Sequence, residues 1–256
     1  MNELTLDAQN YKRKEAWDQI QARYYKETKN QHKDLFEQDS AYFRSLFEFF
    51  YQKINCCSSD RLFEVGANAG RYTKEFLKRS HKVVASDICH ESLDILCKDA
   101  EALHIGRNLE IFKGDIATYR DQHPENLFDV IYCTHVMHHV YRVEPVIKAA
   151  SDMLRPGGRF CCLEPNPFNL MWYIHVFLNP NKQWLVEKGI LNCTYRKMMR
   201  AFKKCGLNRI EYHPIMFFPP QMINVFPALM HLERRMNKIN FLKFFLSVNV
   251  FVAYKC

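Results

Sequence analysis

The feature that most constrains the fold is a regular alternation of short apolar runs and helix-like stretches between residues 61 and 164. Each run has five to seven residues, which suits a buried strand, and the stretches between carry helical spacing or turn residues. Strands that alternate with helices are joined by right-handed crossovers, which produce a parallel sheet covered on both faces. The alternation therefore predicts an α/β protein with a doubly wound sheet. The runs are RLFEV, KVVAS, LEIFK, FDVIYC and GRFCCLE.

The two ends of the chain lie outside this alternation. Residues 9–54 place apolar and aromatic side chains at three-to-four spacing, which predicts N-terminal helices. After Glu164 a proline-broken aromatic stretch leads to a basic amphipathic helix that ends at Gly206, followed by a strand near 208–213. A long apolar and basic segment then precedes a final strand. No internal repeat or low-complexity linker divides the chain, so we predict a single domain.

Composition and charge exclude several classes of protein. Hydrophobic residues make up 48% and charged residues 25% of the 256 residues, which fits neither a disordered nor a fibrous chain. The net charge of +8 permits an anionic partner without requiring one. The polar N-terminus lacks the apolar core of a secretory signal, and no apolar run is long enough for a membrane span, so we expect a cytoplasmic protein. The ten cysteines include no C-x-x-C pair, which disfavours a zinc framework.

The loop LFEVGANAGRYT, at residues 62–73, joins the first predicted strand to a helix. A dinucleotide site requires G-x-G-x-x-G, but the second and third glycine positions are here Asn68 and Arg71. Asn68 would obstruct a pyrophosphate, and Arg71 is too bulky for close helix–strand packing. A P-loop is excluded because no G-K-[ST] follows. The loop instead suits a nucleoside without a pyrophosphate, such as S-adenosylmethionine, whose carboxylate can face amides at a helix N-terminus.

Acidic residues follow the next two predicted strands. Asp87 ends the second strand 21 residues after Gly66, where a carboxylate can accept both ribose hydroxyls; alternatively, it caps the next helix. Asp115 follows the third strand and is a candidate acceptor for an adenine amino group. Asp129, at the start of the fourth strand, is interpreted as structural.

Five motifs in order, FEVGANAGRYT, VVASDI, FKGDI, FDVIYCTHVMHHV and LRPGGRFCCLEPNP, resemble the class I S-adenosylmethionine-dependent methyltransferases, particularly the small-molecule, type 11-like branch. The resemblance implies a mostly parallel, seven-stranded Rossmann-like sheet with an antiparallel last strand. It also implies S-adenosylmethionine as cofactor and S-adenosylhomocysteine as product. Asn68 departs from the family, which usually has glycine there, but asparagine tolerates left-handed backbone angles. The cofactor contacts that the resemblance implies are Glu64, Gly66, Ala67, Asn68 and Gly70 to the methionine part, Asp87 to the ribose, and Asp115 and Ile116 to the adenine, with Ile88 as a further cofactor contact.

The resemblance also gives the single domain, 1–256, an internal organisation. Residues 1–58 form an N-terminal helical cap, and residues 60–165 form the cofactor-binding core. Residues 166–256 supply substrate-side elements and the last strands, including an insertion before the final strand.

Three histidines follow the fourth predicted strand in THVMHHV, at the sheet edge where ligands bind in open α/β folds. A neutral imidazole there can deprotonate a hydroxyl or an amine, and His135, nearest the strand end, is the candidate catalytic residue. We expect Tyr24 and His135 to close the site from opposite sides. His139 also suits packing at a helix start. No carboxylate or cysteine lies at matching helical spacing, so no metal is predicted.

These residues predict methyl transfer to a small-molecule acceptor of hydrophobic, lipid-like or glycan-like character. The alternatives are an RNA or protein methyltransferase and a non-catalytic binding subunit. The sequence CTHV after the fourth strand lacks the N-P-P-[YF] pattern of base-modifying enzymes, so no specific nucleic acid is expected. The apolar and basic segments 166–178 and 217–246 suit the wall of a substrate pocket, a peripheral membrane contact or a dimer interface, and we favour the pocket.

Overall fold

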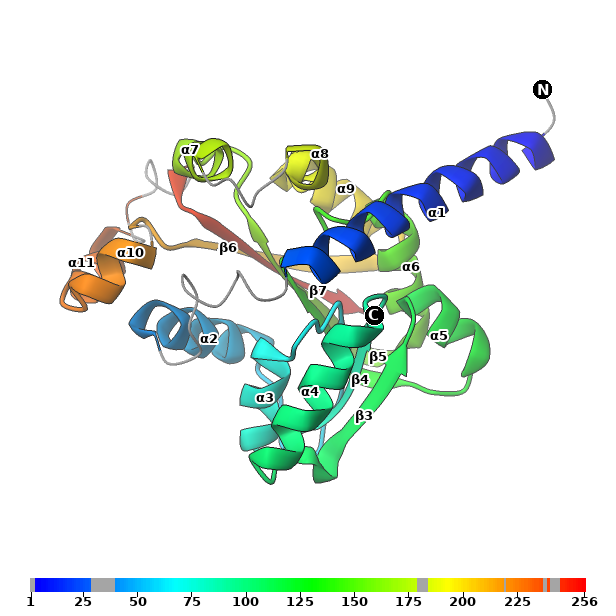
Figure 1. The fold of residues 1–256 in the computed structure, drawn as a ribbon, viewed down its shortest axis with the longest axis horizontal. Coiled ribbons are helices and arrows are strands. Elements are labelled where there is room, and N and C mark those ends of the chain that lie inside the picture. The colour runs from blue at the N-terminus through cyan, green and yellow to red at the C-terminus, as the bar shows by residue number, and fades with distance from the viewer. Residues whose placement is uncertain (1–2, 29–39, 179–183, 219, 237–238, 240–244) are drawn as a thin grey trace.

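A seven-stranded sheet forms the centre of the part of the chain that the computed structural model describes, which is residues 3–28, 40–178, 184–218, 220–236, 239 and 245–256 (Figure 1). The strand order is β3-β2-β1-β4-β5-β7-β6. Strands β1 to β5 are parallel, whereas β7 runs antiparallel to both β5 and β6. The predicted fold class and the antiparallel last strand are therefore confirmed. The strands are β1 (Arg61–Val65), β2 (Lys82–Asp87), β3 (Leu109–Lys113), β4 (Phe128–Thr134), β5 (Leu154–Pro165), β6 (Leu207–Ile215) and β7 (Val248–Lys255).

Helices cover both faces of this sheet. One apolar cluster joins α2, α3 and the end of α4 to the sheet, and another joins α5, α6 and α9 to the opposite face. In β4, Val130 and Tyr132 belong to the first cluster and Ile131 and Cys133 to the second, because successive residues of a strand point to opposite faces. Burial on both faces explains why the parallel strands read as nearly continuous apolar runs. These helices are α2 (Ala41–Ile54), α3 (Arg71–Lys78), α4 (His90–Ala102), α5 (Ile116–Gln122), α6 (Val143–Met153) and α9 (Tyr195–Lys204).

The remaining helices lie outside the two layers. The long helix α1 (Glu3–Thr28) crosses the carboxyl edge of the sheet, whereas α2 is part of a layer (Figure 1). α7 (Leu170–Leu178) and α8 (Trp184–Glu187) follow β5 at this edge. α10 (Pro220–Val225) and α11 (Leu229–Met236) lie beside α2, where Tyr42 N donates a 3.1 Å hydrogen bond to Asn224 Oδ1 (Figure 1). None of the helices in the described ranges combines the length and apolar character needed to span a membrane.

Candidate functional site

The loop after β1 has left-handed backbone angles and leaves no space for a side chain at Gly66 or Gly70. Gly66 and Gly70 have φ values of +70° and +73°, and Asn68 has φ +49°. A Cβ atom on Gly66 would lie 2.5 Å from Val136 Cγ2, and one on Gly70 would lie 2.2 Å from Leu96 Cδ1. The left-handed geometry expected of Asn68 is confirmed, and glycine is required at two points where the loop meets its neighbours.

The end of β2 holds this loop in place. Ser86 O accepts hydrogen bonds from Gly66 N at 2.8 Å and from Ala67 N at 2.9 Å. The Asp87 carboxylate accepts from Asn68 N and from Cys89 N, each at 2.7 Å. Burial raises the pKa of Asp87, and these amide hydrogen bonds offset part of the rise. Asp87 thus joins the loops after β1 and β2, beside the switch point between β1 and β4 where open α/β sheets bind ligands.

Glu64 lies beneath the loop. Its side chain is 1% exposed and accepts hydrogen bonds from Thr73 Oγ1 and, at 2.9 Å, from the Tyr132 hydroxyl. Burial raises its pKa to about 8, although both hydroxyl donors act in the opposite direction. Glu64 therefore ties α3 and β4 to β1 under the glycine-containing turn.

The residues after β3 lie at the same edge of the sheet, next to the end of β2. Asp115 caps α5 by accepting from Thr118 N at 2.8 Å, and its other oxygen accepts from Lys14 Nζ of α1 at 2.8 Å. Burial acts to raise the pKa of Asp115, but Lys14 and Thr118 lower it below its usual value. Ile88 is 38% exposed, whereas Ile116 is 1% exposed and belongs to the core, so only Ile88 offers its side chain at the surface.

His135 lies at the end of β4 with φ +57°. Its backbone N–H donates to Leu163 O of β5 at 2.7 Å, and its side chain is half-buried. Left-handed backbone in a residue other than glycine is uncommon and often occurs at functional sites. Tyr24 is almost fully buried, and the nearby Glu187 carboxylate and burial both raise the pKa of its hydroxyl.

A buried ion-pair network supports the turn after His135. Glu164, at the end of β5, accepts from Val136 N at 2.9 Å and Met137 N at 2.8 Å, and lies 2.6 Å from His138 Nδ1. Glu187 of α8 lies 3.6 Å from His138 Nε2. Burial acts to lower the pKa of His138, but the two carboxylates raise it to about 9. His138 is therefore an imidazolium held between two acids.

Glu187 is a site residue that the sequence analysis missed. His138, His139 and Glu187 place potential ligand atoms within 4.8 Å of one another. Helical spacing around the three histidines does not indicate Glu187, because Glu187 belongs to α8 and is 49 residues beyond His138 in the sequence. Both nitrogens of His138 face carboxylates, Nδ1 that of Glu164 at 2.6 Å and Nε2 that of Glu187 at 3.6 Å. An ion-pair network describes this cluster better than a metal centre.

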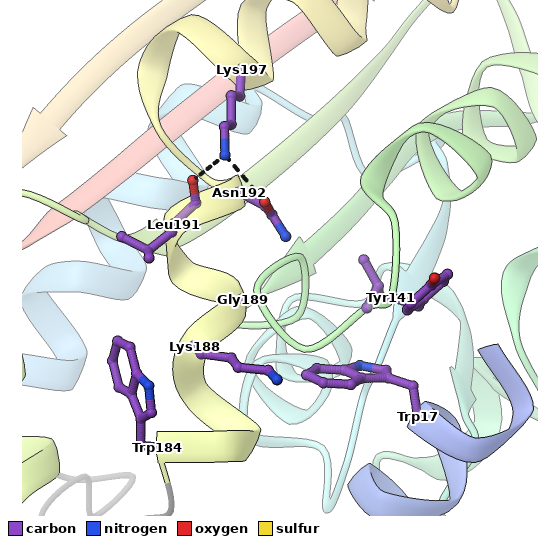
Figure 2. A pocket seen from close by; sticks show the side chains of 9 residues that line it. Trp17, Tyr141, Trp184, Lys188, Gly189, Leu191, Asn192 and Lys197 are labelled. Atoms are coloured by element: carbon purple, nitrogen blue, oxygen red, sulfur yellow. Dashed lines mark hydrogen bonds between the residues drawn. The ribbon is translucent and has the colours of Figure 1, made fainter. Parts of the chain in front are cut away.

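A pocket of about 520 Å³ opens where α1, the loop after β4, the end of α8 with the 3-10 helix Lys188–Asn192 that follows it, and the start of α9 meet (Figure 2). Trp17 Nε1 of α1 donates a hydrogen bond to His139 O. Lys188 Nζ lies 5.4 Å from the centre of the Trp17 ring. Neither Trp17 nor Lys188 was predicted from the sequence to be a site residue. The lining residues are Trp17, Val140, Tyr141, Trp184, Lys188, Gly189, Leu191, Asn192 and Lys197, and none comes from 217–246.

Comparison with known proteins identifies the domain. The family described as "Methyltransferase domain" matches residues 63–162. A ubiquinone biosynthesis O-methyltransferase from Idiomarina loihiensis is 29% identical over 129 residues, which are 50% of this chain and 52% of that protein. The match therefore spans about half the length of this curated relative.

Solved structures share the fold over more of the chain. An S-adenosylmethionine-dependent methyltransferase from Thermotoga maritima aligns over 91% of this chain and 99% of its own, with a TM-score of 0.61 and 14% identity. A geranyl diphosphate C-methyltransferase from Streptomyces coelicolor, in complex with S-adenosylhomocysteine, aligns over 83% and 79%, with a TM-score of 0.54 and 14% identity.

Residues 63–162 match the methyltransferase domain family, and the chain shares its fold with members of the class of S-adenosylmethionine-dependent methyltransferases. The cofactor of this class is S-adenosylmethionine. At 14% identity the structural likeness concerns the fold alone, and the acceptor has to be inferred from the chain's own residues.

Proposed function

We propose that this protein transfers a methyl group from S-adenosylmethionine to a small-molecule acceptor. The observation that carries the proposal is the pairing of the left-handed loop after β1 with Asp87, whose carboxylate bonds the loop amide of Asn68. This arrangement lies at the carboxyl edge of the sheet, beside the switch point where open α/β sheets bind ligands.

The donors and acceptors at this edge fit a nucleoside with an amino-acid tail. Each Asp87 oxygen accepts one amide and retains a lone pair for a ribose hydroxyl. α3 begins after Gly70 with no capping side chain, so its first amides can face the carboxylate of the cofactor. Ile88 supplies an exposed apolar surface near the adenine. Asp115 Oδ2, which accepts one hydrogen bond from Lys14, retains a lone pair for the adenine amino group. Ile116 would contribute through its backbone, and Glu64, Gly66 and Ala67 through the shape of the loop.

The cofactor supplies a methyl group that is already activated on a sulfonium. The protein then has to align the acceptor with that group and exclude water, and such positioning can lower a barrier by about 7–11 kcal/mol. His135, at the end of β4, is placed to take a proton from a hydroxyl or amine of the acceptor. His138 is unsuited to this role because it is buried and already protonated.

Calorimetric titration tests the proposal. S-adenosylmethionine should bind with micromolar affinity, and NADH should not bind. Asp87→Ala should abolish binding, whereas Asp94→Ala, which removes an exposed carboxylate paired with Lys113, should leave it unchanged. Asp87→Asn, which keeps an acceptor oxygen, separates lost ligand contacts from a collapsed loop when thermal unfolding is measured alongside. Binding of NADH, or no binding of S-adenosylmethionine by the wild type, would overturn the proposal and favour a different ligand or a non-catalytic subunit.

A further inference from the structure

The pocket beside α8 combines positive charge with flat aromatic walls. Its two charged side chains, Lys188 and Lys197, are both cations, and its nine lining residues include no carboxylate. Lys197 Nζ donates to Leu191 O at 2.9 Å and approaches Asn192 Oδ1 at 3.3 Å, which fixes this ammonium at the pocket wall (Figure 2). Glu187 is the acid nearest in sequence, but it is buried and paired with His138. The charge of the pocket is therefore complementary to an anion.

Three aromatic rings shape the same pocket. Trp17, Tyr141 and Trp184 line it from three different segments, with Lys188 lying between Trp17 and Trp184 (Figure 2). Indole and phenol faces favour a planar or apolar body over a compact, fully hydrated one. A ligand that satisfies both the rings and the lysines carries its negative charge on a flat or apolar framework.

An exposed apolar strip continues from the pocket along α7. The Trp184 ring stacks on Phe177, with ring centres 5.9 Å apart and planes inclined by 19°. Leu170, Ile174 and Phe177 share one face of α7 through their i, i+4, i+7 spacing, and they are 70%, 39% and 71% exposed. Because a helix rises 1.5 Å per residue, this strip is about 10 Å long. It gives an apolar tail a surface that begins at the pocket.

Helix α1 and the loop after β4 connect the pocket to the residues that we assign to the cofactor. Lys14 and Trp17 are three residues apart on one face of α1, where Lys14 bonds Asp115 and Trp17 bonds His139 O. His139 is four residues beyond His135, in the loop whose next residues, Val140 and Tyr141, line the pocket. Gly189 allows this close assembly, because a Cβ there would lie 1.9 Å from His138 O.

We propose that this pocket is the acceptor site and that it selects an anionic amphiphile. The negatively charged head lies between Lys188 and Lys197, its flat portion contacts Trp17 and Tyr141, and its apolar tail extends past Trp184 along α7. The ligand is a methyl acceptor only through the proposed methyltransferase function, on which this part of the inference rests. The binding specificity is argued from the pocket alone.

Tryptophan fluorescence measures this binding directly. The chain has three tryptophans, Trp17, Trp172 and Trp184, and two of them line the pocket. In a Trp172→Phe background, titration with dodecanoate below its micelle concentration should change the emission. Dodecanoate should bind at least about tenfold more tightly than dodecyltrimethylammonium, because only the anion can pair with the lysines.

Matched variants separate the pocket from general surface adsorption. Lys188→Gln and Lys197→Gln should each weaken dodecanoate binding about tenfold, whereas Lys203→Gln, on an exposed face of α9, should not. Phe177→Ser should weaken dodecanoate but leave 1-naphthoate, a head without a tail, unchanged. Saturating S-adenosylhomocysteine should not weaken either probe.

Three results would overturn the inference. They are equal binding of the cationic and anionic probes, identical behaviour of the Lys188 and Lys203 variants, and displacement of dodecanoate by S-adenosylhomocysteine. Because these titrations contain no S-adenosylmethionine, dodecanoate binding without cofactor binding would reject the methyltransferase proposal while keeping the pocket. Cofactor binding without dodecanoate binding would do the reverse.

Discussion

The two halves of the carboxyl edge are built in different ways. On the cofactor side, the loop after β1 and the end of β2 satisfy one another through short hydrogen bonds, and Glu64 is fully buried beneath them. On the acceptor side, α7 and α8 present large apolar side chains to the surrounding water, among them Phe177 at 71% exposure. Backbone geometry therefore determines the shape of the cofactor side. Exposed apolar side chains determine the acceptor side, and exposed apolar surface of this kind is typical of a ligand-binding site.

The largest effect should come from the network that joins the two halves. Glu164→Gln removes a carboxylate from His138 and weakens the acceptor for two backbone amides, so it should lower the free energy of unfolding by about 3–5 kcal/mol. Urea unfolding measures the change. Glu144→Gln, an exposed acid at the start of α6, should change stability by less than about 0.5 kcal/mol. Equal stability of the two variants would show that the network contributes nothing.

The next effect tests the backbone of the cofactor half. Gly66→Ala places a Cβ at positive φ and against Val136, and should lower stability by about 2–3 kcal/mol together with a loss of cofactor affinity. Gly157→Ala is the matched control, because Gly157 has φ +77° but nothing within 4 Å of the added Cβ. It should cost only the backbone component of about 1 kcal/mol. The same loss at both glycines would mean that the contact with Val136 is unimportant.

A pH dependence should follow from Glu64. Its folded pKa of about 8 lies above the usual 4.5, so the folded state holds a proton that the unfolded state releases between these values. Stability should therefore fall as pH rises through this window, by up to about 1.4 kcal/mol per pH unit. Glu64→Gln should flatten the slope between pH 5 and 6.5. Above that, His138 adds a slope of the same sign, since its pKa is raised to about 9. An unchanged slope in urea unfolding would place the titration elsewhere.

The smallest effect is expected at the contact between Lys14 of α1 and Asp115. Lys14 is 43% exposed and Asp115 28% exposed, so Lys14→Ala should lower stability by less than about 1 kcal/mol. Cofactor affinity should change less than about fivefold, because Asp115 keeps its cap of α5. Calorimetry compared with the exposed Lys12→Ala checks this. A tenfold or larger loss of affinity would make Lys14 part of the cofactor site.

The fold and the cofactor half could be predicted because their signals are local. Each strand run is a short continuous stretch, Gly66, Gly70 and Asp87 lie within residues 66–87, and Asn68 adopts the left-handed angle that its residue type tolerates. The acceptor half was not predictable in the same way. Trp17 meets His139 and Lys188 across more than a hundred residues of sequence, Glu187 meets His138 across 49 residues, and no local spacing marks these contacts. The segment 217–246 was apolar enough to suggest a pocket wall, but its described helices pack beside α2.

The continuity of α1 has a kinetic consequence. Lys14 and Trp17 are one turn apart in an unbroken helix, so neither contact can open far without straining the other. Because α1 contacts both the cofactor residues and the acceptor pocket, a displacement of this helix affects both sites. Release of S-adenosylhomocysteine and binding of the acceptor then require the same displacement of α1. Steady-state kinetics should therefore show a compulsory order of substrate addition and product release.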